Sequence, residues 1–197
     1  MTLRIAGLRS NLAGPFDLMI EAGECIAITG ASGSGKSLFL RMIADLDSSE
    51  GDVFLDGISR STMPAPEWRG QVVYNPAEPG WWAEDVASHF ADIVAALALA
   101  PRLGLPDELL DGPVVRLSTG ERQRLGLIRA LSLDPKVLLL DEPTGALDAE
   151  NTALVEAVLR ERLAGGASIV MVTHSDAQAG RLGDRRFRMA ERRLAGL

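Results

Sequence analysis

Residues 30–37 of this 197-residue chain have the types and the spacing that bind phosphate groups. They match the pattern Gly-x-x-x-x-Gly-Lys-Ser, directly after an apolar run and at the start of a helical pattern. Glycines let backbone N–H groups turn towards the β- and γ-phosphates, and the helix N-terminus adds favourable partial charge. We expect Lys36 to reach those oxygens and Ser37 to ligate Mg²⁺. The expected nucleotide-binding residues are Gly30, Ala31, Ser32, Gly33, Ser34, Gly35, Lys36, Ser37 and Leu38.

Two carboxylates, Asp141 and Glu142, follow the apolar run Val137–Leu140. Beside a phosphate-binding loop, a carboxylate at a strand end can act on Mg²⁺ directly or through water, so Asp141 is the second expected metal ligand. We expect Glu142 to project towards the γ-phosphate and to polarise the attacking water as a general base. Taken alone, the pair would fit a solvated strand end equally well.

The turn Ser118-Thr119-Gly120-Glu121, which opens a helical pattern upstream of these carboxylates, is the most specific feature. With the two motifs above, it resembles the ATP-binding cassette (ABC) family, and the matching motifs run from Gly30 to His174. The resemblance implies ATP and Mg²⁺ as ligands and a homodimer that hydrolyses ATP between its subunits. The implied contacts to ATP held by the opposite subunit come from Ser118, Gly120, Glu121 and Asp148. The implied catalytic residues are Lys36, Glu142 and His174.

The sequence departs from the family pattern at Ala77, where a glutamine that contacts Mg²⁺ and couples the site to a membrane partner is expected. An alanine can do neither, which predicts slow hydrolysis or altered coupling. Glu78 could supply a substitute carboxylate, or it could be an exposed charge without a catalytic role. Upstream of the phosphate-binding loop, residues 7–13 lack the aromatic residue on which adenine usually stacks, and Phe16 occupies a core position. We therefore expect weak adenine stacking and tolerance for GTP.

Alternating strands and helices predict the elements that position these residues. Strands are expected at 3–5, 18–20, 25–29, 53–55, 72–74, 137–140 and 168–172, and helices at 36–46, 84–99, 120–131, 149–163 and 175–182. The basic stretch 181–193 predicts a final strand with a solvated face. The expected fold class is α/β: a P-loop NTPase three-layer α/β/α core with a small antiparallel β subdomain and a short inserted helical subdomain. One nucleotide-binding domain would span residues 1–197, with the helical subdomain at about 78–130.

Composition limits the partners. A net charge of −7 argues against nucleic acid as a partner, and Cys25, the single cysteine, lies in an apolar run that predicts a buried thiol. No secretory signal and no run of about eighteen apolar residues is visible, so we expect a cytoplasmic protein held at the inner face of the membrane by a separate permease. The adjacent Trp81 and Trp82 would either dock on that permease or pack on the core of the helical insert, whereas His89 is expected to be a packing or surface residue.

The sequence as a whole favours the stand-alone ATPase subunit of an ABC transporter, which powers a separate permease through ATP-driven dimer closure. Two alternatives remain open at this stage. One is a soluble ABC ATPase not tied to transport, although such proteins usually carry paired cassettes, long coiled coils or zinc-binding cysteines. The other is a regulatory module that binds ATP with little turnover, which Ala77 would favour.

Overall fold

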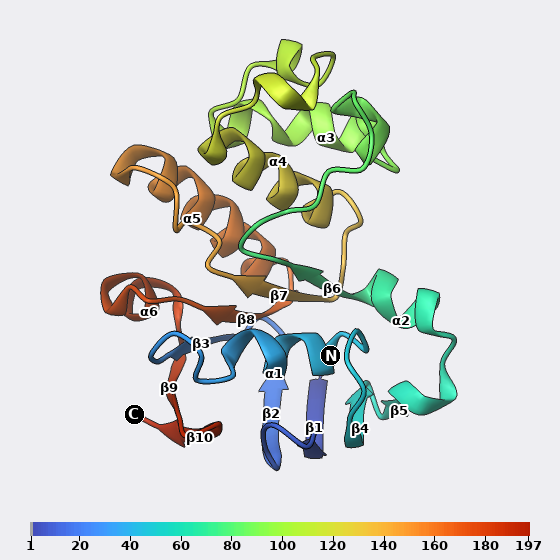
Figure 1. The fold of residues 1–197 in the computed structure, drawn as a ribbon, viewed down its shortest axis with the longest axis vertical. Helices are drawn as coiled ribbons and strands as arrows, with labels where there is room; N and C mark the ends of the chain where they lie inside the picture. Colours follow the sequence, from blue (N-terminus) through green and yellow to red (C-terminus); the bar gives the residue numbers. More distant parts are fainter. Residues whose placement is uncertain (1) are drawn as a thin grey trace.

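The computed structural model describes residues 2–197, and Met1, the first residue of the expected domain, lies outside them. The chain forms two β-sheets with helices around them (Figure 1). The larger sheet has the strand order β10-β9-β3-β8-β7-β6. Its strands are β3 (Cys25–Thr29), β6 (Val72–Asn75), β7 (Val137–Asp141), β8 (Ser168–Val172), β9 (Arg185–Ala190) and β10 (Arg193–Gly196). All neighbours in this sheet pair in parallel except β9 and β10.

The smaller sheet is antiparallel and has the order β2-β1-β4-β5. Its strands are β1 (Thr2–Arg9), β2 (Phe16–Glu21), β4 (Glu50–Leu55) and β5 (Ile58–Ser59). The helices are α1 (Lys36–Ile43), α2 (Ala65–Gln71), α3 (Ile93–Leu99), α4 (Thr119–Leu131), α5 (Ala149–Ala164) and α6 (Asp176–Leu182). Short 3₁₀ turns lie at Arg60–Thr62, Ala87–His89, Pro101–Leu103, Asp107–Leu109 and Val114–Arg116.

Alternate residues of the central strands enter two separate cores, because successive side chains of a strand point to opposite faces. Ile26 and Leu139 pack with α1 and the small sheet, whereas Ala27 and Leu138 pack with α3, α4 and α5. Figure 1 shows α1 between the two sheets and α4 and α5 on the opposite side of the larger one. The strands β3, β7 and β8 are buried along their whole length, as expected of a parallel sheet covered on both faces. The expected α/β fold with a small antiparallel sheet is confirmed.

Cys25 is fully buried in the interior, as expected. Burial, with smaller effects from Asp184 and Glu24, raises the pKa of its thiol to about 12. The thiol therefore stays protonated and unreactive at neutral pH. Within residues 2–197, no helix is both long and apolar enough to cross a bilayer.

The helix expected at 84–99 is wrong over its first half, since α3 begins only at Ile93. The backbone before it pairs with a distant segment instead: the Val86 N–H donates to the Gly112 carbonyl at 3.0 Å and the Val114 N–H to the Glu84 carbonyl at 2.8 Å. Asp92 then caps α3, because its carboxylate accepts the Ala95 N–H at 2.9 Å.

The structure differs from expectation at three further places. The helix expected to reach residue 46 ends at Ile43, and Asp45 has a positive φ of 59°. The basic C-terminal stretch forms a two-stranded hairpin, β9 and β10, where a single strand was expected. Helix α2, which buries Trp68, was not predicted.

Candidate functional site

The phosphate-binding segment forms the turn from β3 into α1. Gly30 has a φ of 150°, and a Cβ there would lie 2.4 Å from the carbonyl oxygen of Met189, so only glycine fits. Lys36 is 6% exposed, and its Nζ donates to two carbonyl oxygens of the turn, at 2.8 and 3.0 Å. Ser37 is exposed at the first turn of α1. The turn therefore places the ammonium group of Lys36 and the hydroxyl of Ser37 at a helix N-terminus, where anions bind favourably.

Asp141 ends β7 and is 5% exposed. The Tyr74 hydroxyl on the neighbouring strand β6 donates to Asp141 Oδ2 at 3.0 Å. Burial, and the adjacent charge of Asp141, raise the pKa of Tyr74, so its hydroxyl stays protonated and keeps donating. Tyr74 thus fixes the orientation of the carboxylate that is the predicted metal ligand.

Glu142 has a backbone conformation that is uncommon for a side chain of its size, with a φ of 48°. Its N–H donates to the Val172 carbonyl of β8 at 2.9 Å. Its carbonyl accepts the Gln123 side-chain Nε2–H at 2.7 Å, and the amide oxygen of Gln123 accepts the Ala146 N–H at 3.0 Å. Gln123 is 4% exposed on α4. One buried amide therefore ties α4 to both ends of the loop that carries Glu142.

The carboxylate of Glu142 lies against His174, as the predicted catalytic set requires. The His174 N–H donates to Glu142 Oε2 at 3.1 Å, and His174 Nε2 lies 3.3 Å from Oε1. Burial raises the pKa of Glu142, against the opposing effects of His174 and Lys36. Burial likewise lowers the pKa of Lys36, although Glu142 and Asp141 oppose that shift. A carboxylate with a raised pKa is a stronger base once it is deprotonated.

These groups share one open cleft of about 430 Å³. Its lining residues are Leu12, Ser32, Gly33, Gly35, Lys36, Ser37, Leu38, Ala77, Asp141, Glu142, His174 and Arg192. Gly30, Ala31 and Ser34 line a neighbouring groove, which His174 also borders. The structure therefore brings the predicted phosphate-binding, metal-binding and catalytic residues together, although motifs far apart in the sequence supply them.

The residues expected to contact a second copy lie elsewhere, because Ser118, Gly120 and Glu121 do not line this cleft. Ser118 and Glu121 form a capping box at the start of α4: Glu121 Oε2 accepts the Ser118 N–H at 2.8 Å, and Ser118 Oγ accepts the Glu121 N–H at 3.3 Å. The hydrogen bonds from Ser118 lower the pKa of Glu121. Asp148 caps α5 through the Asn151 N–H at 2.8 Å.

A larger groove of about 820 Å³ lies beside the first. Glu142 and His174 border both grooves, and Asp148 and Thr144 line the larger one. The predicted catalytic pair, Glu142 and His174, thus lies at the boundary between this cleft and a second open surface that carries Asp148.

The two departures from the family pattern have clear positions. Ala77 lines the cleft with Asp141, whereas Glu78 is exposed and does not line it, so the cleft gains no carboxylate from Glu78. Phe16 is 2% exposed in the core, as expected. Instead of an aromatic ring, the cleft contains the side chains of Leu12 and Arg192.

The two adjacent tryptophans have different environments. Trp81 is half-buried and packs against the core of the helical insert, whereas Trp82 is 71% exposed. His89 lies between them, with ring centroids 4.8 Å from Trp81 and 4.5 Å from Trp82. Its Nε2 accepts the N–H groups of Trp82 at 2.9 Å and Ala83 at 3.1 Å, which makes it the packing residue that the sequence suggested.

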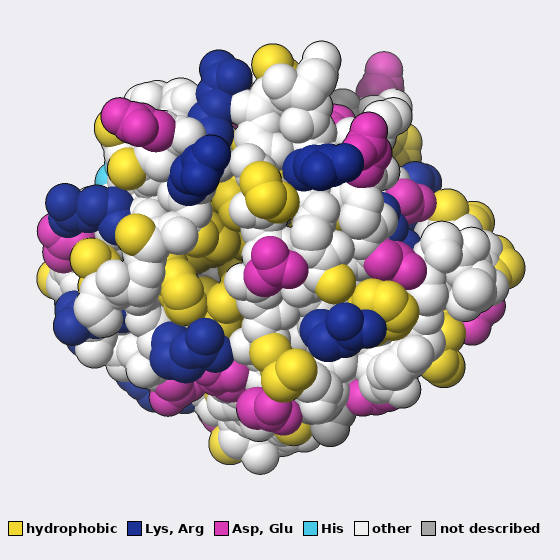
Figure 2. Space-filling view, turned by 90° about the horizontal axis from the view of Figure 1, so that it is seen from below, with side chains coloured by type: hydrophobic (Ala, Val, Ile, Leu, Met, Phe, Trp, Pro, Cys, Tyr) yellow, Lys and Arg dark blue, Asp and Glu magenta, His cyan; other side chains and the backbone are white. Residues whose placement is uncertain are grey.

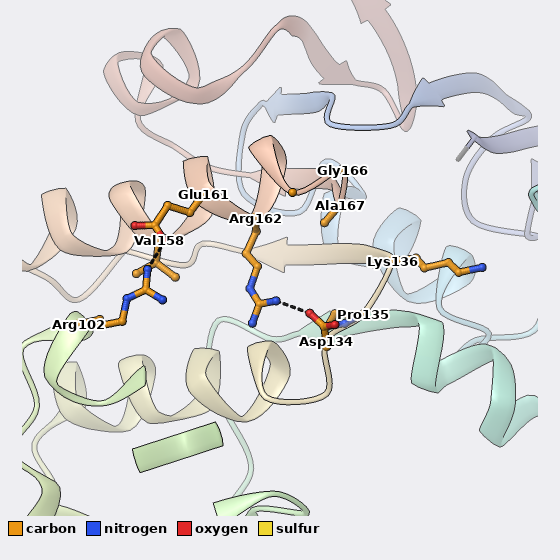
Figure 3. A pocket seen from close by; sticks show the side chains of 10 residues that line it. Arg102, Asp134, Pro135, Lys136, Val158, Glu161, Arg162, Gly166 and Ala167 are labelled. Carbon is orange, nitrogen blue, oxygen red and sulfur yellow. Dashed lines mark hydrogen bonds and ion pairs between the residues drawn. The ribbon is translucent and has the colours of Figure 1, made fainter. Parts of the chain in front are cut away.

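A further cavity of about 560 Å³ lies away from the predicted site. Figure 3 shows the ion pairs Arg102–Glu161 and Arg162–Asp134 across it, together with Lys136. Opposite charges compensate one another there, and no predicted site residue lines it.

Sequence reasoning missed Tyr74, Gln123 and Arg192. Tyr74 gave a weak signal, since it is the single tyrosine of the chain and lies in an otherwise apolar strand. Gln123 and Arg192 gave none, because their partners lie far away in the sequence.

Comparisons with known proteins show which family the chain resembles. The family model for ABC transporters matches residues 14–145. The macrolide export ATP-binding/permease protein of Aeromonas hydrophila is 37% identical over 180 residues, which cover 81% of this chain and 27% of that protein. The aliphatic sulfonates import ATP-binding protein of Albidiferax ferrireducens is 35% identical over 193 residues, covering 90% of this chain and 65% of that protein. The chain thus spans less than two thirds of the length of these relatives.

The fold also matches a solved structure. A dimeric ATP-binding cassette in a post-hydrolysis state, bound to ADP and Pi, superposes with a TM-score of 0.85 at 24% identity. The match covers 100% of this chain and 99% of that one. At that level of identity, the likeness shows the fold.

Proposed function

The chain belongs to the ABC transporter family, and we propose that it is the subunit that binds and hydrolyses ATP to power a separate transmembrane permease. One observation carries the proposal: the phosphate-binding turn, Asp141, Glu142 and His174 line a single cleft. Residues 1–197 would act as one nucleotide-binding domain, with residues 78–130 as its helical subdomain. It would lie at the cytoplasmic face of the membrane, held there by the permease.

The geometry of the cleft supports the following proposed roles in hydrolysis. Lys36 binds the β- and γ-phosphates, and Glu142 accepts a proton from water as that water attacks the γ-phosphorus and the bond to the bridging oxygen breaks. His174, 3.3 Å from Glu142, orients the water and the γ-phosphate. Ser37 and Asp141 offer a hydroxyl and a carboxylate, a donor set that suits Mg²⁺ when water and phosphate oxygens complete its shell. A bound Mg²⁺ ion would supply positive charge against the charge that develops on the phosphates.

A second copy would complete the site. Ser118, Gly120 and Glu121 lie outside the cleft of their own chain, at the N-terminus of α4, where partial positive charge can meet a γ-phosphate. The groove with Asp148 adjoins Glu142 and His174, so a partner chain seated there would reach the catalytic pair. We infer a homodimer that ATP closes and hydrolysis reopens.

The test is phosphate release with ATP and Mg²⁺, for the unmodified chain and for Glu142→Gln. We expect measurable hydrolysis in the first and a fall of about a hundredfold or more in the second, because the variant keeps the shape of the side chain but loses the base. Tight ATP binding with no hydrolysis in the unmodified chain would contradict the proposal. That result would favour the low-turnover regulatory module. The absence of a polar group at Ala77 in the cleft is consistent with such a module.

The surface around Trp82 is the proposed contact with the permease. Trp82 is 71% exposed, and the Arg129 guanidinium lies 4.9 Å from its ring centroid. We expect Trp82→Ala to abolish co-purification of the permease and to leave the melting temperature unchanged. Trp81→Ala is the matched variant and should lower the melting temperature, because Trp81 packs on the core. Undiminished permease capture by Trp82→Ala would contradict this assignment.

A further inference from the structure

The turn between β9 and β10 presents one arginine to the nucleotide cleft. Ala190 pairs with Arg193, so Glu191 and Arg192 are the two turn residues, with φ values of 47° and 62°. Positive φ at both positions is the conformation of a type I′ turn, whose twist matches that of the strands. The hairpin therefore holds the Arg192 backbone in a defined place.

Two hydrogen bonds hold Arg192 against the loop that precedes β2. Its Nη1 donates to the Leu12 carbonyl at 2.9 Å, and its own carbonyl accepts the Gly14 N–H at 3.2 Å. Its stem lies over the phosphate-binding turn, because a Cβ on Gly35 would be 3.6 Å from Arg192 Cγ. Two loops from opposite ends of the chain thus meet beside the phosphate-binding turn.

Figure 2 looks onto the end of the molecule where, in Figure 1, the β1–β2 and β9–β10 turns lie. Basic side chains stand there around a hollow in which hydrophobic side chains are visible. Arg192 itself is exposed and forms no ion pair within residues 2–197. Leu12 is 51% exposed. A guanidinium that lacks an ion-pair partner among the described residues and an apolar side chain therefore lie together on an open surface.

The lining of the cleft indicates what these two side chains face. The phosphate-binding turn with Leu38 accounts for the phosphates, and Asp141, Glu142, His174 and Ala77 surround the proposed reaction centre. Leu12 and Arg192 are the lining residues that remain. The part of the nucleotide that is left for them to face is the nucleoside. A planar guanidinium stacks on aromatic rings, and a leucine packs against their edges.

We propose that Arg192 and Leu12 form the wall of the site that faces the purine base, with the guanidinium plane stacked on the ring in place of an aromatic residue. This inference rests on the proposed function. Because either purine ring offers a face to stack on, and no side chain of the pair reads the ring substituents, ATP and GTP are bound about equally well.

The experiment compares the affinities of ATP, GTP and inorganic triphosphate, each with Mg²⁺, by calorimetric titration. Inorganic triphosphate carries the phosphates without the base. The variants are Arg192→Asn, which tolerates positive φ, and Arg192→Lys, which keeps the charge and loses the plane. Arg193→Ala is the control, since Arg193 is an exposed neighbour outside the cleft.

We expect both Arg192 variants to weaken ATP and GTP binding by about three- to thirtyfold, the range of a cation–π contact, and to leave triphosphate binding unchanged. Leu12→Trp should tighten ATP binding, a gain that misfolding cannot produce. Equal losses for ATP and triphosphate, or no loss for ATP, would overturn the inference and leave the proposed function standing. If the unmodified chain binds neither ATP nor triphosphate, the proposed function falls and this inference falls with it.

Discussion

At the scale of single residues, the site depends on side chains that hold the catalytic groups in place. Tyr74 fixes Asp141 from the neighbouring strand, and Gln123 fixes the backbone of Glu142. Both act through hydrogen bonds that are at least partly buried, where a lost bond can leave an unsatisfied partner. The predicted catalytic residues are therefore only part of the machinery that their geometry requires.

Removing the Tyr74 hydroxyl tests whether its hydrogen bond positions Asp141. Tyr74→Phe keeps the ring and loses the 3.0 Å hydrogen bond to Asp141. We expect the rate of ATP hydrolysis to fall roughly tenfold, since a hydrogen bond to a charged group contributes about 1.5 kcal/mol, and half-maximal activity to need more Mg²⁺. A variant with normal kinetics at every Mg²⁺ concentration would show that Tyr74 is merely a packing residue.

The raised pKa of Glu142 has a consequence for stability. The charged carboxylate is less favourable in the folded chain than in the unfolded one, so the free energy of unfolding falls as pH rises from the ordinary glutamate range through the raised pKa. Glu142→Gln removes this titration. Denaturant titrations should therefore find the variant more stable than the unmodified chain at neutral pH. The difference should vanish below the unfolded pKa of glutamate, near pH 4. Lower stability of the variant at neutral pH would refute the shift.

At the scale of elements, α4 connects several parts of the site. Its capping box fixes the turn that is proposed to meet the second nucleotide, and Gln123 reaches the Glu142 loop. Gly126 lies against the segment that carries Ala77, because a Cβ there would be 2.3 Å from Pro79 Cγ. A displacement of α4 would therefore shift the Glu142 loop and the segment that carries Ala77, both of which line the cleft.

The capping box gives a prediction for this element. Glu121→Ala removes the carboxylate that accepts the Ser118 N–H, and we expect it to lower the free energy of unfolding by about 1 kcal/mol. Glu150→Ala, which removes an exposed acid from the first turn of α5, is the control and should have a smaller effect. Equal effects of the two substitutions in denaturant titrations would contradict the structural role of the box.

The sequence predicted the elements whose patterns are local. The buried strands β3, β7 and β8 and the helices α4 and α5 have periodicity or caps that a short window contains. It failed where distant partners decide the structure, as at 84–86, where pairing with residues 112–114 replaces a helix. Arg192 escaped prediction for the same reason, since it contacts Leu12 from the other end of the chain.

At the scale of the whole molecule, the surfaces proposed to bind ATP are divided. The phosphate-binding turn and Glu142 lie in one cleft, and the Ser118 turn lies outside it. In this proposal a single chain would contact one nucleotide from one side, and two copies arranged head to tail would enclose two. That division matters most, because the proposed closure, hydrolysis and drive to a permease all depend on it.

Light scattering of Glu142→Gln with ATP and Mg²⁺ tests this claim most directly. We expect a particle of twice the 21.0 kDa of one chain with ATP, and a single chain with ADP. Ser118→Arg, added to the same variant, should abolish the dimer and spare ATP binding, because Ser118 lies outside the cleft of its own chain. A single chain at saturating ATP, or a dimer that Ser118→Arg leaves intact, would contradict the proposed homodimer.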